Sequence, residues 1–252
     1  MTKIALCFLT YENLSQPKLW RKFIDNNKDR LNVYIHNKND FVEDEYQLNQ
    51  YCIQNRVPTK YSHKSVVEAE LTLFKEAHKH DAANAFFILL SDKCVPLYNF
   101  DHIYTSIFAE NSNMVASGKD HGNKCRHQDL TDREFISVEE FAKDHQWLML
   151  NRDSVDFFIN NNFLDMYSDQ FAAVDEHYFG NICNKFKIPY KSQLVTYVNW
   201  ADESDNKNDR PYPKTYEILT NEMIVNDVLP RNTFFMRKIS ANCPLPSYFD
   251  DI

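Results

Sequence analysis

The chain has 252 residues, of which 43% are hydrophobic and 14% aromatic, and this composition excludes an intrinsically disordered protein. The net charge of −8 leaves no basic surplus for binding nucleic acid, so nucleic acid is not an expected partner. No apolar run reaches the roughly 18 residues of a transmembrane helix, and the N-terminal run is expected to be a strand rather than a signal peptide.

The first part of the chain alternates between strand and helix patterns. Ser65 and Glu68 have the spacing of a capping box, which predicts that a helix begins at Ser65 and ends near His80. The order of the elements predicts an α/β fold in which ligands bind at the carboxyl ends of the strands. The expected elements are strands at residues 3–10, 31–36 and 85–92, and helices at residues 19–26 and 65–80.

The second part is less regular, and no linker divides it from the first, so we expect a single domain over residues 1–252. Strands are expected at residues 114–117, 147–150, 194–200 and 233–239, and helices at residues 152–161, 174–186 and 221–228.

The numbers and positions of glycine and cysteine further limit the kinds of binding site that the chain can form. Only three glycines occur, Gly118, Gly122 and Gly180, which argues against the glycine-rich phosphate loops of Walker and dinucleotide-binding proteins. The six cysteines include no C-x-x-C pair, and we expect buried free thiols in a reducing compartment.

The stretch LLSDKCVPLYNF, residues 89–100, resembles the signature of the core-2/I-branching glycosyltransferase family, most closely its plant-type and microbial branches. Seven further motifs agree in order and spacing. They are KIALCFLT, YIH, SVVEAELTL, HQWLML, VDEHYF, TYVNWAD and FFMRKIS, so that the resemblance covers residues 3 to about 240.

This resemblance implies a GT-A-like fold, a Rossmann-like mixed sheet flanked by helices. It also implies transfer of a sugar, with inversion, from a nucleotide sugar to a hydroxyl of a glycan. Animal members use UDP-N-acetylglucosamine or UDP-xylose without a metal ion. Residues 1–110, approximately, would form the nucleotide-sugar-binding half, and about 111–252 the acceptor and catalytic half.

An inverting transferase needs one base to remove the proton of the acceptor hydroxyl. The resemblance assigns this role to Glu176 in VDEHYF, with Asp175 at the start of the helix beside the acceptor. Taken alone, both acids would be read as solvated residues of a helix N-terminus. His177 is expected to be a packed histidine rather than a ligand.

The leaving diphosphate needs stabilisation, which most GT-A enzymes supply with a metal ion on a D-x-D motif. The chain has no D-x-D motif, and we expect no metal and no cofactor beyond the UDP-sugar substrate. In metal-independent members two basic side chains replace the cation. The resemblance places Lys214 and Lys238 there, with Arg210 and Arg237 as neighbours that could substitute.

The remaining site residues concern the two substrates. Trp200 stands at the position of an acceptor-side tryptophan, and Trp147 is a second candidate for which a core position is favoured. Donor contacts are expected from strand ends and a helix start, at Thr10, His36, Ser65 and Ser91. Where animal members have I-H-V-D this chain has IHNK, so the acid near uridine is missing.

The disulfides and membrane anchor of animal members have no clear counterparts, so the expected protein is soluble and cytoplasmic, from a microbe or a virus. Three alternatives stay open: a metal-dependent transferase, a glycan- or nucleotide-sugar-binding module without catalysis, and a hydrolase using Asp175 with Glu176. The last is disfavoured because adjacent helical residues point about 100° apart. The sequence gives no indication of the oligomeric state.

Overall fold

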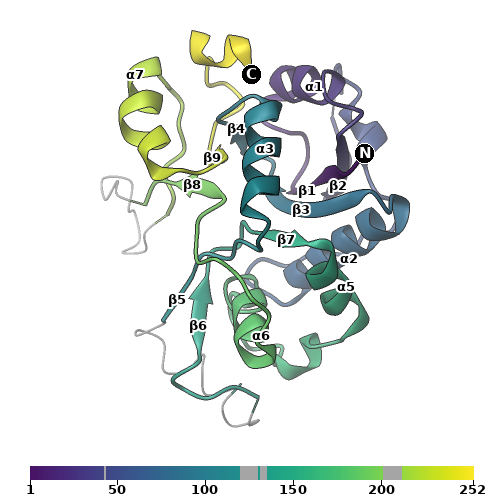
Figure 1. Cartoon of the computed structure of the whole chain (residues 1–252). Coiled ribbons are helices and arrows are strands. Elements are labelled where there is room, and N and C mark those ends of the chain that lie inside the picture. Colours follow the sequence, from purple (N-terminus) through teal and green to yellow (C-terminus); the bar gives the residue numbers. More distant parts are fainter. Residues whose placement is uncertain (43, 120–129, 131–134, 201–211) are drawn as a thin grey trace.

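A four-stranded sheet with the order β2-β1-β3-β7 organises the computed structural model, which describes residues 1–42, 44–119, 130, 135–200 and 212–252 (Figure 1). Strand β1 (Lys3–Thr10) runs parallel to β2 (Leu31–Asn37) on one side and to β3 (Asn84–Ser91) on the other. Strand β7 (Met149–Asn151) is antiparallel to β3. The central strands are apolar because both of their faces are buried.

Helices cover both faces of this sheet (Figure 1). Ala5 and Cys7 of β1 face a core cluster with α2 (Ser65–His80) and α5 (Arg152–Asn160). The alternate residues of β1 face a second cluster with α1 (Pro17–Asp25) and α3 (Phe100–Glu110). The expected α/β arrangement of a mixed sheet flanked by helices is therefore confirmed.

The capping box predicted for α2 is wrong in detail, although the limits of the helix are correct. Lys64 is the N-cap residue and makes no side-chain cap hydrogen bond, while Ser65 is the first helical residue. The Ser65 hydroxyl accepts a hydrogen bond from the Lys60 N–H at 3.0 Å and lies 3.1 Å from His63 Nδ1. The turn before the helix thus uses the oxygen that the capping box would have needed.

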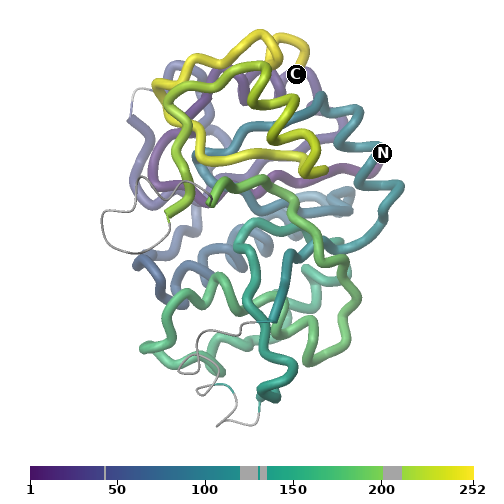
Figure 2. The backbone as a smooth tube through the Cα atoms, turned by 90° about the vertical axis from the view of Figure 1, so that its left-hand side faces the viewer, coloured from purple at the N-terminus to yellow at the C-terminus, as the bar shows by residue number. Residues whose placement is uncertain are grey.

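Short strands complete the second half of the chain. Strand β9 (Phe235–Arg237) lies between β4 (Val95–Pro96) and β8 (Thr196–Val198), antiparallel to β4 and parallel to β8. Strands β5 (Ser117–Lys119) and β6 (Ala142–Asp144) form an antiparallel pair. In Figure 2 the yellow C-terminal segment lies in the same upper part of the molecule as the purple N-terminal strands.

The helix expected over residues 174–186 is interrupted, which corrects the prediction that Asp175 begins it. A 3₁₀ helix, Val174–Glu176, is followed by α6 (Phe179–Phe186). Helix α7 (Asn221–Met223) continues into a π-helix at Ile224–Val228. The other 3₁₀ helices described are Leu48–Tyr51, Leu164–Met166, Leu229–Arg231 and Ser247–Asp251.

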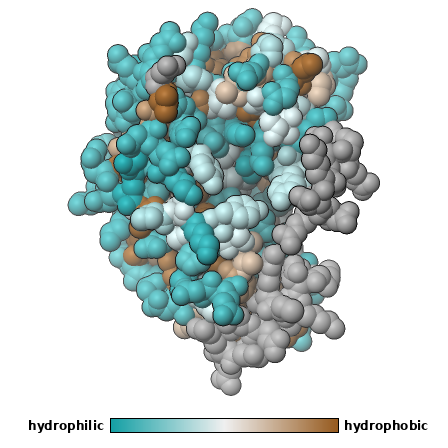
Figure 3. All heavy atoms as spheres, turned by 180° about the vertical axis from the view of Figure 1, so that it is seen from behind, coloured by the Kyte–Doolittle hydropathy of each residue, from teal (hydrophilic) through white to brown (hydrophobic). Residues whose placement is uncertain are grey.

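The described cysteines are free thiols as expected, and all but Cys52 are buried; Cys125 lies outside the described residues. On the back of the molecule hydrophilic residues predominate, and hydrophobic ones appear in separate small patches (Figure 3).

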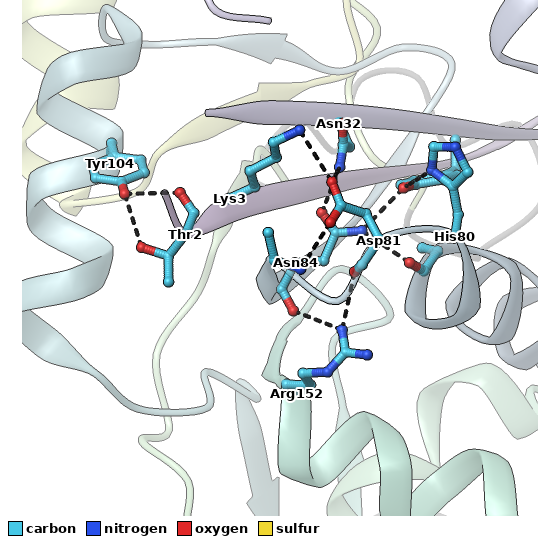
Figure 4. Close-up of polar contacts among 11 residues, drawn as sticks. Thr2, Lys3, Asn32, His80, Asp81, Asn84, Tyr104 and Arg152 are labelled. Carbon is cyan, nitrogen blue, oxygen red and sulfur yellow. Dashed lines mark hydrogen bonds and ion pairs between the residues drawn. The ribbon is translucent and has the colours of Figure 1, made fainter. Parts of the chain in front are cut away.

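The amino edge of the sheet is closed by a polar cluster around Asp81 (Figure 4). The Asp81 carboxylate accepts hydrogen bonds from the Ala83 N–H at 2.8 Å and from Asn32 Nδ2 at 2.9 Å, and Lys3 Nζ lies 3.1 Å away. These donors lower the pKa of Asp81 to about 2. Arg152 joins α5 to the same cluster through the carbonyl oxygens of His78, Asp81 and Asn84.

We expect Asp81→Asn to lower the free energy of unfolding by about 1–2 kcal/mol at pH 7, a value reduced for partial exposure. The folded-state pKa lies below the ordinary value of 3.8, so the stabilisation is present above that value and is lost as the pH falls toward 2. Urea unfolding of both proteins should show the difference shrink between pH 5 and pH 3. Asp153→Asn, at an exposed acid of α5, is the matched control.

Candidate active site

The carboxyl edge of the parallel strands collects three of the predicted donor residues. Thr10 ends β1 and Ser91 ends β3, and the register sets Leu9 opposite both Ser91 and His36 of β2. All three predicted side chains are buried. Among the described residues, the buried atoms Thr10 Oγ1 and His36 Nδ1 have no hydrogen-bond partner, and neither do Ser15 Oγ and Asn37 Oδ1 close by. Buried polar atoms usually have a hydrogen-bond partner, so the unpaired atoms at this edge are available to bind a polar ligand.

His36 is held as a neutral imidazole. Its Nε2 accepts the Val57 N–H at 2.9 Å, which leaves the proton on Nδ1. Burial lowers the pKa of His36, and the charge of Arg56 acts in the same direction. The ring therefore presents an N–H donor at the carboxyl edge near neutral pH.

Two of the predicted donor residues already have local partners. Ser91 Oγ lies 3.3 Å from Cys94 Sγ and accepts the Lys93 N–H at 3.3 Å, so it fixes the turn after β3. The Ser65 hydroxyl is engaged with Lys60 and His63, as described above. Their contact with a donor stays a prediction.

Backbone hydrogen bonds hold the predicted cations side by side. The Lys214 N–H donates to Asn199 O at 2.8 Å, and the Lys238 N–H donates to Lys214 O at 3.4 Å. The Ile239 N–H donates to Lys93 O at 2.9 Å, which brings this segment to the turn after β3. Arg210 lies outside the described residues.

Positive charge is concentrated around one carboxylate, that of Asp92. Burial, the largest cause, and the charges of Arg237 and Lys93 together lower the pKa of Lys238 to about 8. Burial raises the pKa of Asp92, while Lys93, Arg237 and Lys238 act against that increase. Three cations thus surround a single acid at the end of β3, and an added anion would relieve their repulsion.

Trp147 supports Arg237 from the core. The Trp147 side chain is 6% exposed, and the Arg237 guanidinium lies 4.4 Å from its ring centroid. The favoured core interpretation of Trp147 agrees with this burial. Trp200, by contrast, is 43% exposed and meets His145 edge-on, with ring centroids 6.4 Å apart. Of the two tryptophans, Trp200 is the one that a ligand can reach.

Glu176 ends the Val174–Glu176 3₁₀ helix, and its side chain is 29% exposed. Its Oε2 lies 3.1 Å from Lys143 Nζ of β6. Asp175 lies near the buried Glu70, whose pKa it helps to raise after the larger effect of burial. Asp175 does not cap α6, because that helix starts at Phe179 and Asp144 accepts the Gly180 N–H instead.

His145 lies close enough to both Glu176 and Arg237 for their charges to affect its pKa. Burial lowers the pKa of His145, the charge of Glu176 raises it, and Lys143 and Arg237 lower it. Glu176 and Arg237 therefore both lie near the segment that holds His145 and Trp147. Sequence reasoning missed Lys143, Asp144 and His145, although the HQWLML motif begins at His145.

Two cavities lie elsewhere. One of about 270 Å³ is lined by residues of α2 and α5, and one of about 200 Å³ by residues of α1, α3 and the C-terminal segment. Within the part of the chain that the structure describes, no group of three or more His, Cys, Asp or Glu could hold a metal ion. Independence from metal stays a prediction. No helix among the described residues is long and apolar enough to cross a membrane.

An α/β sheet with polar residues gathered at the carboxyl ends of its parallel strands defines a Rossmann-like ligand-binding protein. The family model "Branch: Core-2/I-Branching enzyme" matches residues 4–228. The chain therefore belongs to the core-2/I-branching enzyme family of glycosyltransferases.

The chain is similar to "Glycosyltransferase BC10" of Oryza sativa subsp. japonica, with 30% identity over 156 residues. That match covers 60% of this chain but only 38% of the rice protein. Among solved structures, an active-site mutant of LgtC aligns with a TM-score of 0.43 and 9% identity, over 96% of this chain and 85% of the other. The galactosyltransferase LgtC in complex with donor and acceptor sugar analogs aligns with a TM-score of 0.41 and 9% identity, over 96% and 84%. Similarity at this level does not identify acting residues.

The charge state of Lys238 can be measured without any ligand. We expect its ε-ammonium group to titrate near pH 8, below the ordinary value of 10.5, because it is partly buried beside other cations. Reductive ¹³C-methylation followed by NMR titration measures this pKa, and Lys238→Arg identifies the resonance. A methyl resonance that titrates above pH 10 would contradict the crowded cation cluster.

Proposed function

We propose that this protein is an inverting, metal-independent glycosyltransferase. It moves a sugar such as N-acetylglucosamine or xylose from a UDP-sugar to a hydroxyl of a glycan. The observation that carries the proposal is that one accessible carboxylate, Glu176, and the cation Arg237 both lie near His145 and Trp147. Family membership and the curated rice relative, named a glycosyltransferase, support the reaction class.

In this mechanism Glu176 accepts the proton of the acceptor hydroxyl as its oxygen attacks the anomeric carbon. The hydroxyl becomes more acidic as its bond to an oxocarbenium-like centre forms, so a carboxylate is a sufficient base. Trp200 offers an exposed aromatic face to the acceptor sugar. The bond from the anomeric carbon to the diphosphate breaks on the opposite side, which inverts the configuration.

The departing UDP gains negative charge on its diphosphate, which Lys238, Lys214 and Arg237 would stabilise. The neutral His36 and the hydroxyls at the carboxyl ends of the strands would contact the nucleoside. The donor therefore draws on both halves of the chain, with its diphosphate held by residues of the second half.

We expect Glu176→Gln to lower sugar transfer by about 100-fold or more, because glutamine cannot act as a base. UDP-sugar binding should persist, since the carboxylate acts on the acceptor. Thermal-shift screening with UDP-N-acetylglucosamine and UDP-xylose identifies the donor, and UDP release with a glycan panel measures turnover. Glu139→Gln, at an exposed glutamate, is the matched control. Turnover of Glu176→Gln close to that of the control would refute the assignment.

The cations are tested by UDP affinity, measured by calorimetry. Lys238→Met and Lys214→Met should each weaken UDP binding by about 10-fold, the effect of losing one charge-assisted hydrogen bond. Lys79→Met, in the last turn of α2 at the opposite edge of the sheet, should have no effect. Since the pKa of Lys238 is about 8, affinity should decline from pH 7 to pH 9.

EDTA should leave both UDP affinity and turnover unchanged. Inhibition by EDTA that manganese reverses would favour a metal-dependent transferase. Nucleotide-sugar binding without turnover across the acceptor panel would favour a binding module.

A further inference from the structure

Strand β6 is attached at three points to the segment that contains Glu176. The Asn181 side chain bonds both backbone groups of Ala142, at 2.8 and 2.9 Å, and donates to His177 O at 2.6 Å. Lys143 pairs with Glu176. Asp144 Oδ2 accepts the Gly180 N–H at 2.7 Å. The orientation of Glu176 therefore depends on where β6 lies.

Asp144 is an unusual member of this set because its carboxyl group is buried, with the residue 3% exposed. A Cβ atom on Gly180 would lie 2.0 Å from Asp144 Oδ1, so only glycine leaves room for the carboxyl group. Ser117 is the register partner of Asp144 on β5. Within the described residues, neither the buried Ser117 Oγ nor Asp144 Oδ1 makes a hydrogen bond of normal geometry. The Ser117 hydroxyl can donate to or accept from the Asp144 carboxyl group, whose Oδ2 also accepts the Gly180 N–H.

The charged and titratable groups around Asp144 favour this uncharged form. Glu176 faces it from the 3₁₀ helix, and Cys183 of α6 and Tyr167 interact with it electrostatically. Lys143 and His145 are its neighbours in sequence. Burial, together with the charge of Glu176, raises the pKa of Asp144 to about 7, while Ser117 and the Gly180 N–H limit the increase.

We propose that Asp144 is a positioning residue for sugar transfer, which in its uncharged form joins β5 to the start of α6 and so holds Glu176 in place. The proposal rests on the proposed function, because it takes Glu176 as the base. Loss of the Asp144 proton leaves a second negative charge, buried and beside Glu176, and its desolvation and repulsion disfavour the packing of β6 against α6. The attachment of α6 to β6 weakens, and transfer declines as the pH rises through about 7.

The titration is tested first without substrates, by thermal unfolding of the wild type and Asp144→Asn from pH 5 to pH 8.5. The folded-state pKa lies above the ordinary value of 3.8, so this stabilisation is complete at low pH and is lost as the pH rises through about 7. Asparagine keeps the shape of the protonated acid and its donor. The melting temperature of Asp144→Asn should therefore gain roughly 5 °C or more on the wild type across this range.

Asp153→Asn, at an exposed acid, should follow the wild type and serves as the control. Parallel curves for wild type and Asp144→Asn would overturn the proposal. Because the comparison is a difference between two proteins, the titration of the distant His36, which both share, cancels.

The second arm is the pH profile of turnover. The ratio of turnover at pH 8.5 to turnover at pH 6 should rise at least threefold in Asp144→Asn. Ser117→Ala should move the alkaline decline to higher pH, because the Ser117 hydroxyl lowers the pKa of Asp144. A purely structural role would change stability but leave these profiles in place, and unchanged profiles overturn the proposal.

Failure of the positioning role of Asp144 can be distinguished from failure of the proposed function. If Glu176→Gln abolishes transfer and Asp144→Asn keeps the wild-type profile, the role of Asp144 is wrong and the function stands. If Glu176→Gln retains full transfer, the assigned base is wrong, and the positioning role of Asp144 is overturned with it.

Discussion

The pairing of β9 with β4 is the constraint on which the candidate site depends. Val95 pairs with Met236 and Pro96 with Phe235, so a strand near the end of the chain lies against the turn that follows β3. Phe235 and Met236 are completely buried, and each contributes roughly 1.5–3 kcal/mol by leaving water. Apolar burial thus closes the long loop between the two strands. The polar residues that follow, Arg237 and Lys238, are placed beside Asp92 as a consequence.

Two carboxyl groups of the structure, Asp81 and Asp144, have pKa values shifted in opposite directions. At the amino edge Asp81 receives several hydrogen-bond donors, and its pKa falls to about 2. On the side of Glu176, Asp144 is buried beside another acid, and its pKa rises to about 7. Raised pKa values cluster at functional sites because burial and like charges are tolerated there at a cost to stability. Asp81 stabilises the amino edge of the sheet, whereas Asp144 lies beside the proposed base.

Long, locally encoded elements could be predicted from the sequence, and short ones could not. Strands β1 to β3 and helix α2 follow the predicted limits to within a residue, because their apolar runs and periodicity are continuous. The break before α6 had no such signal. It is set by His177, whose buried ring lies against Phe141, with centroids 5.3 Å apart, and whose Nδ1 is 2.8 Å from Ala173 O. Those contacts are tertiary, and a helical pattern cannot reveal them.

In the candidate site, too, residues in recognisable motifs could be predicted, and residues placed by tertiary contacts could not. Glu176, Lys238 and Trp200 are candidates because of ordered motifs rather than local physics, and their roles stay predictions. Asp144 was missed because an acid in a three-residue strand gives no reason to expect burial. Gly180 is one of only three glycines, which suggests a position where a side chain would not fit. Nothing in the sequence indicated that a carboxyl group would fill the space beside it.

The ion pair between Lys143 and Glu176 sets a condition on base catalysis. The Lys143 ammonium group lies 3.1 Å from Glu176 Oε2, so this ion pair has to open before that oxygen can take the proton of an acceptor hydroxyl. Lys143 is 47% exposed, and an exposed pair of this kind contributes only about 0–1 kcal/mol. An acceptor hydroxyl can therefore displace the lysine at little cost. The buried contacts of Asn181 with Ala142 and of Asp144 with Gly180 do not involve Lys143, and we infer that they, rather than the ion pair, hold Glu176 in position.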